Sequence, residues 1–300
     1  MDRKNHLDAQ AMILMLVLCM AWGLQQVAIK VAMSGVSPVW QAGLRSIGAT
    51  LLVWAWAAHK GIRLFERDGT LFPGLLSAAL FAGEFAFIYW GLGYTSASRG
   101  VVFLYTAPFM VAFGAHCFLP GERLRPMQWL GLAFAFAGIL AAFGESLGMP
   151  TRRQLLGDGM LFLGAVLWAA TTLVIKSSRL SKVNPAKTLF YQLAGSALAL
   201  PCVALALGEP GVIALTPLTL LSIAYQTALI AFASYLAWFW LLTHYPAGRL
   251  AAFSFLTPLF GVLAGALLLG EHVGPVLAAA LGLVVFGIWL VNRPPRRGSL

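Results

Sequence analysis

The sequence is a succession of long apolar runs, each about as long as a helix that crosses a lipid bilayer. Such a helix needs about 20 mostly apolar residues, because the hydrocarbon core is about 30 Å thick. The runs that meet or approach this length are 11–33, 39–58, 71–93, 97–119, 127–144, 157–177, 186–207, 217–243, 249–269 and 273–292. Charged residues make up 10% of the chain, against about 25% in soluble domains. The outer surface must therefore face lipid, and we predict an all-α integral membrane protein with ten transmembrane helices.

Basic residues collect in every second connection between these runs. They occupy both tails, residues 60–67, 123–125 and 176–187, and Arg249. The alternate connections hold only Lys30, Arg99, Arg152 and Arg153. Cytoplasmic loops of membrane proteins carry the excess of Lys and Arg. We therefore expect multi-pass insertion into a bacterial inner membrane with both termini in the cytoplasm, which requires an even number of spans.

Several classes of function are disfavoured by what the sequence lacks. It has no H-E-x-x-H motif and no Walker motif, so neither zinc-dependent nor ATP hydrolysis is expected. Cys19, Cys117 and Cys202 lie in apolar runs without metal-ligand spacing. The net charge of +10 follows from the basic loops, and no basic run accompanies a nucleic-acid binding module. We predict no enzyme activity, no cofactor, no metal site and no nucleic-acid partner.

The two halves of the chain repeat one another in order. The matched pairs are Trp22 with Trp168, Lys30 with Lys176, Trp90 with Trp240, Arg99 with Arg249, Phe103 with Phe253, Pro108 with Pro258 and Glu122 with Glu271. Each half has five runs, an odd number, so the second half must insert in the opposite sense. We predict two inverted five-helix repeats around a central cavity, an arrangement common among secondary transporters. The predicted parts are a cytoplasmic tail 1–10, a first repeat 11–144, a periplasmic linker 145–156, a second repeat 157–292 and a basic cytoplasmic tail 293–300.

These motifs, taken in order, resemble those of a known family. Trp-Gly and Trp-Ala stand in the first and sixth runs, residues 93–99 lead to Pro108, and Gly-Glu follows the fourth and ninth runs. The whole chain resembles the drug/metabolite transporter superfamily, EamA type, and within it the bacterial exporters of aromatic and other amino acids. The resemblance implies a ten-helix basket with a central cavity lined by the first, third, fourth, sixth, eighth and ninth spans. It also implies efflux of amino acids or related metabolites.

Polar and aromatic residues inside the first and sixth runs are candidates for the cavity wall. Trp22, Gln25 and Gln26 share one helix face, because residues three and four apart are neighbours on a helix. Trp168 and Thr172 stand at the matching places of the sixth run. An aromatic ring beside amide and hydroxyl groups suits a zwitterion with an apolar side chain. The alternative is that these groups form hydrogen bonds between helices and hold the bundle together.

Glu84 is the clearest carboxylate inside a predicted span, and Phe87 lies near it. Intramembrane charges are costly and usually face a cavity or a partner. One interpretation gives Glu84 a substrate ammonium or a coupled proton. The other pairs it with Arg45, which lies at the same predicted depth on the preceding helix, in a structural ion pair.

Further aromatic residues complete the predicted cavity, and two prolines are predicted to bend helices. Tyr105 is a candidate in the fourth run, and Tyr235 and Trp238 share a face of the eighth. Pro108 and Pro258 lie in mid-span at matching places. Proline lacks an N–H and clashes with the carbonyl four residues earlier, so both are candidate hinges.

The predicted function is secondary, ATP-independent export of amino acids, preferentially apolar or aromatic ones, by alternating access through the central cavity. The predicted partners are the amino-acid substrate and the lipid bilayer, with protons as a candidate coupling ion and a monomer as the expected state. An alternative is efflux of hydrophobic cations by proton antiport at Glu84. An alternative that does not involve transport is a membrane enzyme or a receptor-like scaffold.

Overall fold

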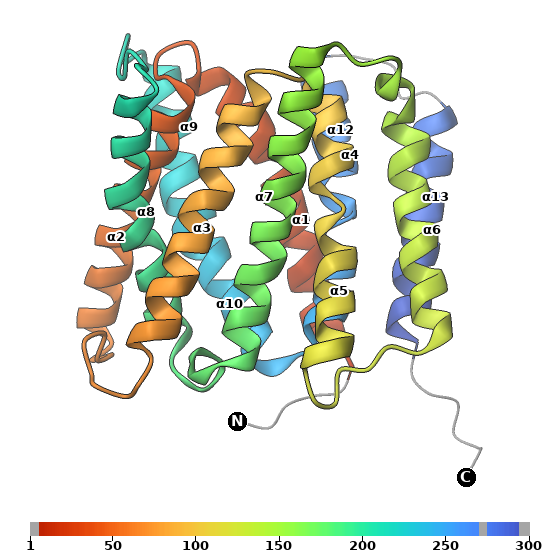
Figure 1. Ribbon diagram of the computed structural model, residues 1–300, viewed down its shortest axis with the longest axis horizontal. Coiled ribbons are helices and arrows are strands. Elements are labelled where there is room, and N and C mark those ends of the chain that lie inside the picture. Colours follow the sequence, from red (N-terminus) through yellow and green to blue (C-terminus); the bar gives the residue numbers. More distant parts are fainter. Residues whose placement is uncertain (1–5, 270–274, 294–300) are drawn as a thin grey trace.

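A computed structural model describes residues 6–269 and 275–293, without the side chains of Gln26, Lys30, Ala97, Ser98, Glu145, Ser146 and residues 265–269. Most described residues belong to helices that stand side by side (Figure 1). The elements are α1 (Ala9–Ala32), α2 (Pro38–His59), α3 (Leu71–Leu92), α4 (Ala97–Leu104), α5 (Ala107–Phe118), α6 (Pro126–Phe143), η1 (Gly144–Leu147), α7 (Arg152–Ser177), η2 (Arg179–Lys182), α8 (Pro185–Ala206), α9 (Pro217–Ala224), η3 (Tyr225–Ser234), α10 (Tyr235–His244), α11 (Ala247–Phe253), α12 (Leu256–Leu269) and α13 (Pro275–Asn292). This all-helical architecture confirms the predicted all-α fold class, and the inverted arrangement of two repeats stays a prediction.

The helices cross the bundle in alternating directions. α1 begins and α13 ends at the same face, which we call the termini face and which lies at the bottom of Figure 1. α4 with α5, α9 with η3 and α10, and α11 with α12 each make one crossing (Figure 1). By length and composition, 9 helical segments among the described residues can cross a membrane. α2, with 22 residues, is not among these segments but runs beside them through the bundle (Figure 1). The chain is a multi-pass membrane protein.

Local signals fix where several helices begin. The Asp8 carboxylate accepts a hydrogen bond from the backbone N–H of Ala11 at 2.9 Å, and the Asn184 side chain accepts one from Ala186 at 3.0 Å. These bonds satisfy donors that the first helical turn leaves without a partner. Proline opens α2, α6, α8 and α9, at positions where its missing N–H costs nothing.

Two crossings are interrupted close to the matched prolines. α4 ends at Leu104 and α5 begins at Ala107, while α11 ends at Phe253 and α12 begins at Leu256. Pro108 and Pro258 lie just beyond these gaps, and neither can donate the backbone hydrogen bond that a continuous helix would need there. The helices are thus interrupted where the sequence predicts bends, and a hinge motion there stays a prediction.

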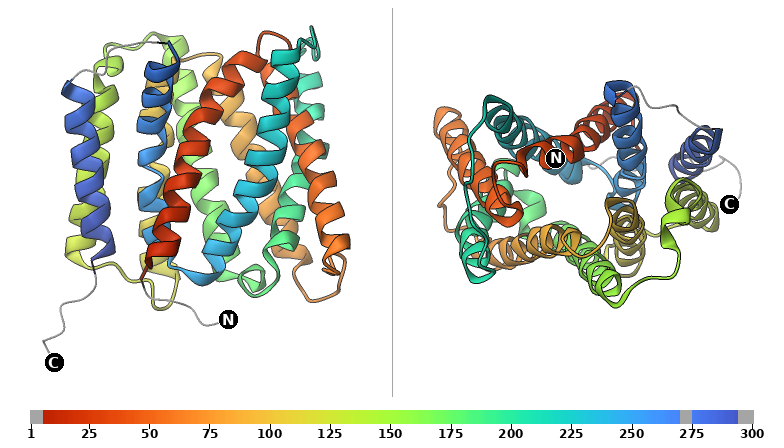
Figure 2. Two further views of the ribbon diagram at one scale, coloured as in Figure 1. Left: turned by 180° about the vertical axis from the view of Figure 1, so that it is seen from behind. Right: turned by 90° about the horizontal axis from the view of Figure 1, so that it is seen from above.

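The surface and the packing both suit a lipid environment. Phe72, Phe118 and Leu198 are each more than 70% exposed, which would be costly in water. α6 and α13 form a pair beside the ring of the other helices (Figure 2). Their backbones approach closely at glycines, since a Cβ added to Gly131 would lie 2.6 Å from the carbonyl oxygen of Gly287. Small residues at such contacts are typical of helix packing in membranes.

Candidate functional site

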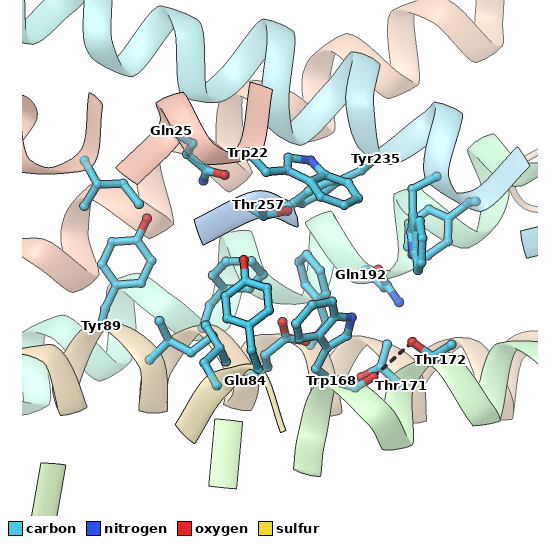
Figure 3. Close-up of a pocket in the computed structure, with 18 of the residues that line it drawn as sticks. Trp22, Gln25, Glu84, Tyr89, Trp168, Thr171, Thr172, Gln192, Tyr235 and Thr257 are labelled. Carbon is cyan, nitrogen blue, oxygen red and sulfur yellow. Dashed lines mark hydrogen bonds between the residues drawn. The ribbon is translucent and has the colours of Figure 1, made fainter. Parts of the chain in front are cut away.

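A cavity of about 140 Å³ lies in the middle of the ring of helices. Its wall comes mainly from α1, α3, α7 and α10, with residues of α4, α8 and α12. Trp22 and Gln25 face Glu84 and Trp168 across the space (Figure 3). The lining is mostly aromatic and aliphatic with a few polar groups, which is the usual make-up of a site for a small organic molecule.

Aromatic contacts join neighbouring elements of the cavity wall. The rings of Trp22 and Trp238 meet edge to face at 5.7 Å between centroids, and the Trp22 Nε1–H donates to Ser234 Oγ at 2.9 Å. The rings of Tyr105 and Trp168 meet at 6.2 Å. These edge-to-face pairs join α1 to α10 and α4 to α7, so the cavity has defined aromatic corners.

Most of the predicted cavity residues lie together in this wall. The predicted residues that line the cavity are Trp22, Gln25, Glu84, Tyr105, Trp168, Thr172, Tyr235 and Trp238. The side chain of Gln26 is outside the described part of the chain. Their placement brings both halves of the sequence to one space, while their role in transport stays a prediction.

Phe87 is half-buried and is not among the residues that line the cavity. The residues of α3 that line the cavity are Phe81, Glu84, Phe85, Ile88, Tyr89 and Leu92. At about 100° per residue, these positions centre on a face that Phe87 misses by about a third of a turn. The apolar run is hydrophobic on every side, so it did not reveal which way the helix is rotated.

Sequence reasoning also missed several lining residues. Gln192 of α8 and Thr257 of α12 contribute polar groups, and Phe85 and Tyr89 contribute rings. A glutamine inside an apolar run was the available signal for Gln192, but the family resemblance places its span outside the cavity. Phe85 and Tyr89 are four residues apart and therefore share one face of α3. Because Glu84 lies next to that face, assigning Glu84 to the cavity could have predicted both rings there.

Glu84 is 7% exposed and lines the cavity. Among the described residues, its carboxylate has no hydrogen bond and no ion pair within 4.0 Å, although Arg45 acts on it electrostatically. The predicted direct ion pair between Glu84 and Arg45 is thus not formed. Arg45 instead places its guanidinium over the ring of Phe85, 4.2 Å from the centroid.

A polar network closes the bundle between the cavity and the termini face. Lys176 Nζ lies 3.0 Å from a Glu122 carboxylate oxygen and donates to the backbone carbonyls of Leu242 and Tyr245 at 2.8 and 2.6 Å. The Tyr245 hydroxyl donates to the Asp8 carboxylate at 3.0 Å. These contacts join the ends of α1, α7 and α10 to the loop before α6.

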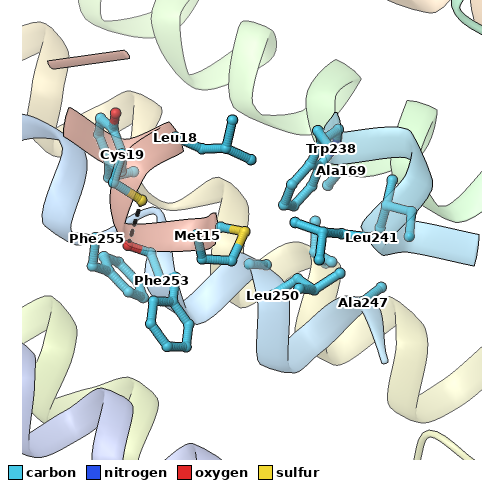
Figure 4. Packing of buried hydrophobic residues seen from close by; sticks show 14 of the residues in the cluster. Met15, Leu18, Cys19, Ala169, Trp238, Leu241, Ala247, Leu250, Phe253 and Phe255 are labelled. Carbon is cyan, nitrogen blue, oxygen red and sulfur yellow. Dashed lines mark hydrogen bonds between the residues drawn. The ribbon is translucent and has the colours of Figure 1, made fainter. Parts of the chain in front are cut away.

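Apolar packing seals the same region. Met15 and Leu18 of α1 pack with Trp238 and Leu241 of α10 and with Leu250 of α11 (Figure 4). Trp238 belongs both to this cluster and to the cavity wall, so the cluster lies directly beneath the cavity. Movement of a solute from the cavity to the termini face would require these helices to separate.

The described residues contain neither a nucleophile turn nor a group of metal ligands that would indicate an enzyme. Residues 144–148 read G-E-S-L-G and match the letters of the nucleophile motif G-x-S-x-G, which sequence reasoning overlooked. That motif needs a strand-to-helix turn, whereas this segment follows α6 as the short helix η1. Within 6–269 and 275–293, no three His, Cys, Asp or Glu side chains gather as metal ligands. His116 Nδ1 accepts from the backbone N–H of Leu124 at 2.9 Å and serves the local fold.

Comparison with known proteins places the chain among transporters. The model of the EamA-like transporter family matches residues 9–144 and again 155–293. A probable amino-acid metabolite efflux pump of Salmonella typhimurium is 28% identical over 92% of this chain and 93% of its own length. The Escherichia coli protein of the same description is 26% identical, with 93% of each chain covered.

Two further comparisons extend the match. An uncharacterized transporter of Archaeoglobus fulgidus is 24% identical over 97% of this chain and 98% of its own length. A solved crystal structure superposes with a TM-score of 0.79, covering 94% of this chain and 97% of the other at 21% identity. The relatives match over more than nine-tenths of their length, and the solved structure has the same fold.

Proposed function

We propose that this chain, which belongs to the EamA-like transporter family, exports amino acids with apolar or aromatic side chains through the central cavity. Proteins of this family are transporters rather than enzymes, and two of the relatives are described as probable amino-acid metabolite efflux pumps. The substrates of these relatives are not assigned to this chain. The substrate class proposed here rests on the cavity.

The observation that carries the proposal is an aromatic cavity with a single acidic side chain in its described wall. Trp22, Trp168 and Tyr235 offer ring surfaces, and Glu84 offers a carboxylate without a protein partner. A cavity of about 150 Å³ can hold a benzene ring, and this one has about 140 Å³. A small aromatic or branched solute with one ammonium group matches both its size and its polarity.

Alternating access supplies the route. The network around Lys176 and the apolar cluster around Met15 close the cavity toward the termini face. Arg63, Arg123 and Lys182 are exposed on the loops of that face, and an excess of basic residues marks the cytoplasmic side. We therefore assign the termini face to the cytoplasm of a bacterial inner membrane. Export then requires the closed end to open, load from inside and close again.

Counterflow in proteoliposomes tests the proposal. Purified protein is reconstituted, loaded with one unlabelled amino acid and offered labelled phenylalanine, leucine, serine or glutamate outside. We expect accumulation of labelled phenylalanine and leucine to exceed that of serine and glutamate. The matched control is Phe87→Ala, on the same helix but outside the cavity, which should behave as the wild type. Accumulation equal to empty liposomes for every amino acid would disprove the proposal.

A second candidate is efflux of hydrophobic cations, which one observation favours. Glu84 carries the unpartnered charge of the described cavity wall, and a lone carboxylate among rings also suits a lipophilic cation. The same proteoliposomes are then offered labelled tetraphenylphosphonium. Exchange of this cation together with failure of every amino acid would favour the second candidate over the first.

A further inference from the structure

Arg45 is a buried cation next to the cavity with no close hydrogen-bonding partner. It lies on α2, its exposed fraction is 0%, and Nε, Nη1 and Nη2 have no acceptor within 3.5 Å among the described residues. The hydroxyl of Tyr235 interacts with the guanidinium at longer range. An Arg side chain carries five N–H donors and stays charged. A buried cation without acceptors is costly, so such a residue in a membrane bundle marks a functional site more often than a purely structural one.

One ring separates this guanidinium from the cavity. The ring of Phe85 lies 4.2 Å from Arg45 Cζ, and the ring of Tyr235 lies 6.0 Å from it. Both rings line the cavity. A change in the side-chain torsions of Phe85 would therefore open the guanidinium to a solute, with no movement of α2 needed.

The charges on either side of Phe85 are complementary and separate. Glu84, the preceding residue of α3, lines the cavity, whereas Arg45 lies behind the ring of Phe85. The two groups act on each other electrostatically but form no ion pair within 4.0 Å. Two opposite charges that are close but not in contact suit a molecule that carries both an ammonium and a carboxylate.

Other polar groups without partners surround the same place. The hydroxyl of Tyr89 and both amide atoms of Gln192 are buried, belong to residues that line the cavity and have no partner in the described chain. Native proteins satisfy nearly all such groups. Several of them around one cavity indicate that its occupant completes the hydrogen bonding.

We infer that Arg45 recognises the carboxylate of the transported amino acid once Phe85 turns aside, while Glu84 holds its ammonium. This inference rests on the proposed function and deepens it, because it limits the substrates to zwitterions. A guanidinium suits the role, since it binds a carboxylate through two parallel hydrogen bonds. An amine without a carboxylate would lack this contact and leave the guanidinium unpartnered.

The test compares phenylalanine with phenylalaninamide, which keeps the ring and the ammonium but has no carboxylate. Each competes for counterflow of labelled phenylalanine by the wild type, and the labelled amide is also exchanged directly. We expect the wild type to favour the acid by about tenfold or more, the effect of one charged hydrogen-bonded contact. Arg45→Gln should lose this preference by exchanging the acid at least about tenfold more slowly and the amide at the wild-type rate.

Two further variants keep the test decisive if Arg45→Gln fails to fold. Arg45→Lys retains the charge but not the paired donors, so a reduced preference for the acid is expected. Phe85→Leu removes the covering ring and should increase that preference. An unchanged ratio of acid to amide in the Arg45 variants would overturn the role of Arg45. Exchange of the two compounds at equal rates by the wild type would do the same.

The outcomes also separate this inference from the proposed function. If the wild type exchanges amino acids and exchanges phenylalaninamide equally well, the proposed export function stands. The role of Arg45 in binding the carboxylate is then excluded. A wild type that exchanges neither phenylalanine nor any other amino acid overturns both. Equal slowing of the acid and the amide in Arg45→Gln would identify Arg45 as a structural residue.

Discussion

At the scale of single residues, Glu84 and Trp22 lie on opposite sides of the cavity and make different contributions to it. Glu84 contributes a carboxylate that has no hydrogen bond and no ion pair within 4.0 Å among the described residues, although Arg45 acts on it electrostatically. Trp22 contributes a ring and a hydrogen bond that hold α1 against the π-helical segment η3, through Ser234. The first side chain is expected to matter for the solute and the second for the stability of the wall, so substitutions at the two sites should have distinct effects.

Glu84→Gln should lower amino-acid counterflow by at least about tenfold, because the amide cannot replace a charged hydrogen bond to an ammonium. The fold should be kept or become slightly more stable, since the variant buries no unpaired charge. Initial rates at several pH values and thermal unfolding in detergent measure both effects. Unchanged transport at every pH would rule out a substrate role and a proton role for Glu84.

Trp22→Phe and Ser234→Ala should each destabilise the protein by about 0.5–1.5 kcal/mol, the net value of one hydrogen bond. The double variant should cost less than the sum of the two single variants, because each single change already removes the same contact. Unfolding in detergent across this cycle measures the coupling. Strictly additive effects would mean that the Trp22–Ser234 bond does not support the cavity wall.

At the scale of elements, the bundle depends on close backbone contacts at some glycines and not at others. On α13, a Cβ added to Gly287 would meet the backbone nitrogen of Ala135 at 2.6 Å, whereas one added to Gly282 would meet nothing within 4 Å. The α6–α13 contact therefore leaves room for a side chain at Gly282 but not at Gly287. This difference offers a matched pair of variants.

Gly287→Ala should destabilise the protein by about 1–3 kcal/mol through overpacking. Gly282→Ala should be neutral or slightly stabilising, because alanine favours a helix by up to about 1 kcal/mol over glycine. The difference in unfolding midpoint between the two variants in detergent measures the effect. Equal midpoints would contradict the close approach of α6 and α13.

The loop between α2 and α3 is held to α8 by an ion pair that depends on pH. Lys187 Nζ lies 2.8 Å from Asp68 Oδ2, and the hydrogen bond from Lys187 lowers the pKa of Asp68 to about 2. The carboxylate has an unfolded-state pKa of about 3.9. The stabilisation is therefore present above about pH 4 and is lost as the pH falls toward 2.

Asp68→Asn should lower the unfolding temperature at pH 7, and its deficit relative to the wild type should shrink between pH 4 and pH 2. Glu66→Gln is the control in the same loop, because Glu66 meets Arg63 at 4.0 Å with both side chains mostly exposed and such pairs contribute little. Differential scanning fluorimetry in detergent gives both profiles. A deficit that stays constant down to pH 2 would exclude the Asp68 carboxylate as its source.

At the scale of the whole molecule, the sequence predicts the fold well because the bilayer fixes helix length. All ten apolar runs correspond to crossings, and α7 differs most, beginning at Arg152 instead of residue 157. Thr151 explains this difference: its hydroxyl accepts from the Gln154 N–H, and the helix starts at that cap before the apolar residues begin. Length and local capping are properties of the sequence alone.

Helix rotation is less predictable from the sequence, and it decides the details of the cavity. Trp22, Glu84 and Trp168 were predictable because polar or aromatic groups on apolar helices turn inward. The position of Phe87 and the missing contact between Glu84 and Arg45 were not predictable from the sequence. Each depends on a rotation of tens of degrees about a helix axis. Tertiary packing sets such rotations, and a helix that is apolar on every side gives no local signal for them.

Protection of a cavity residue by the transported solute tests the central claim most directly. Thr172 of α7 lines the cavity, and Thr172→Cys is made in a background with Cys19, Cys117 and Cys202 replaced by alanine. We expect phenylalanine to slow labelling of this cysteine by a small maleimide in proportion to its counterflow, and glutamate to leave labelling unchanged. Labelling that does not respond to an amino acid which the same protein transports would show that the solute does not pass through this cavity.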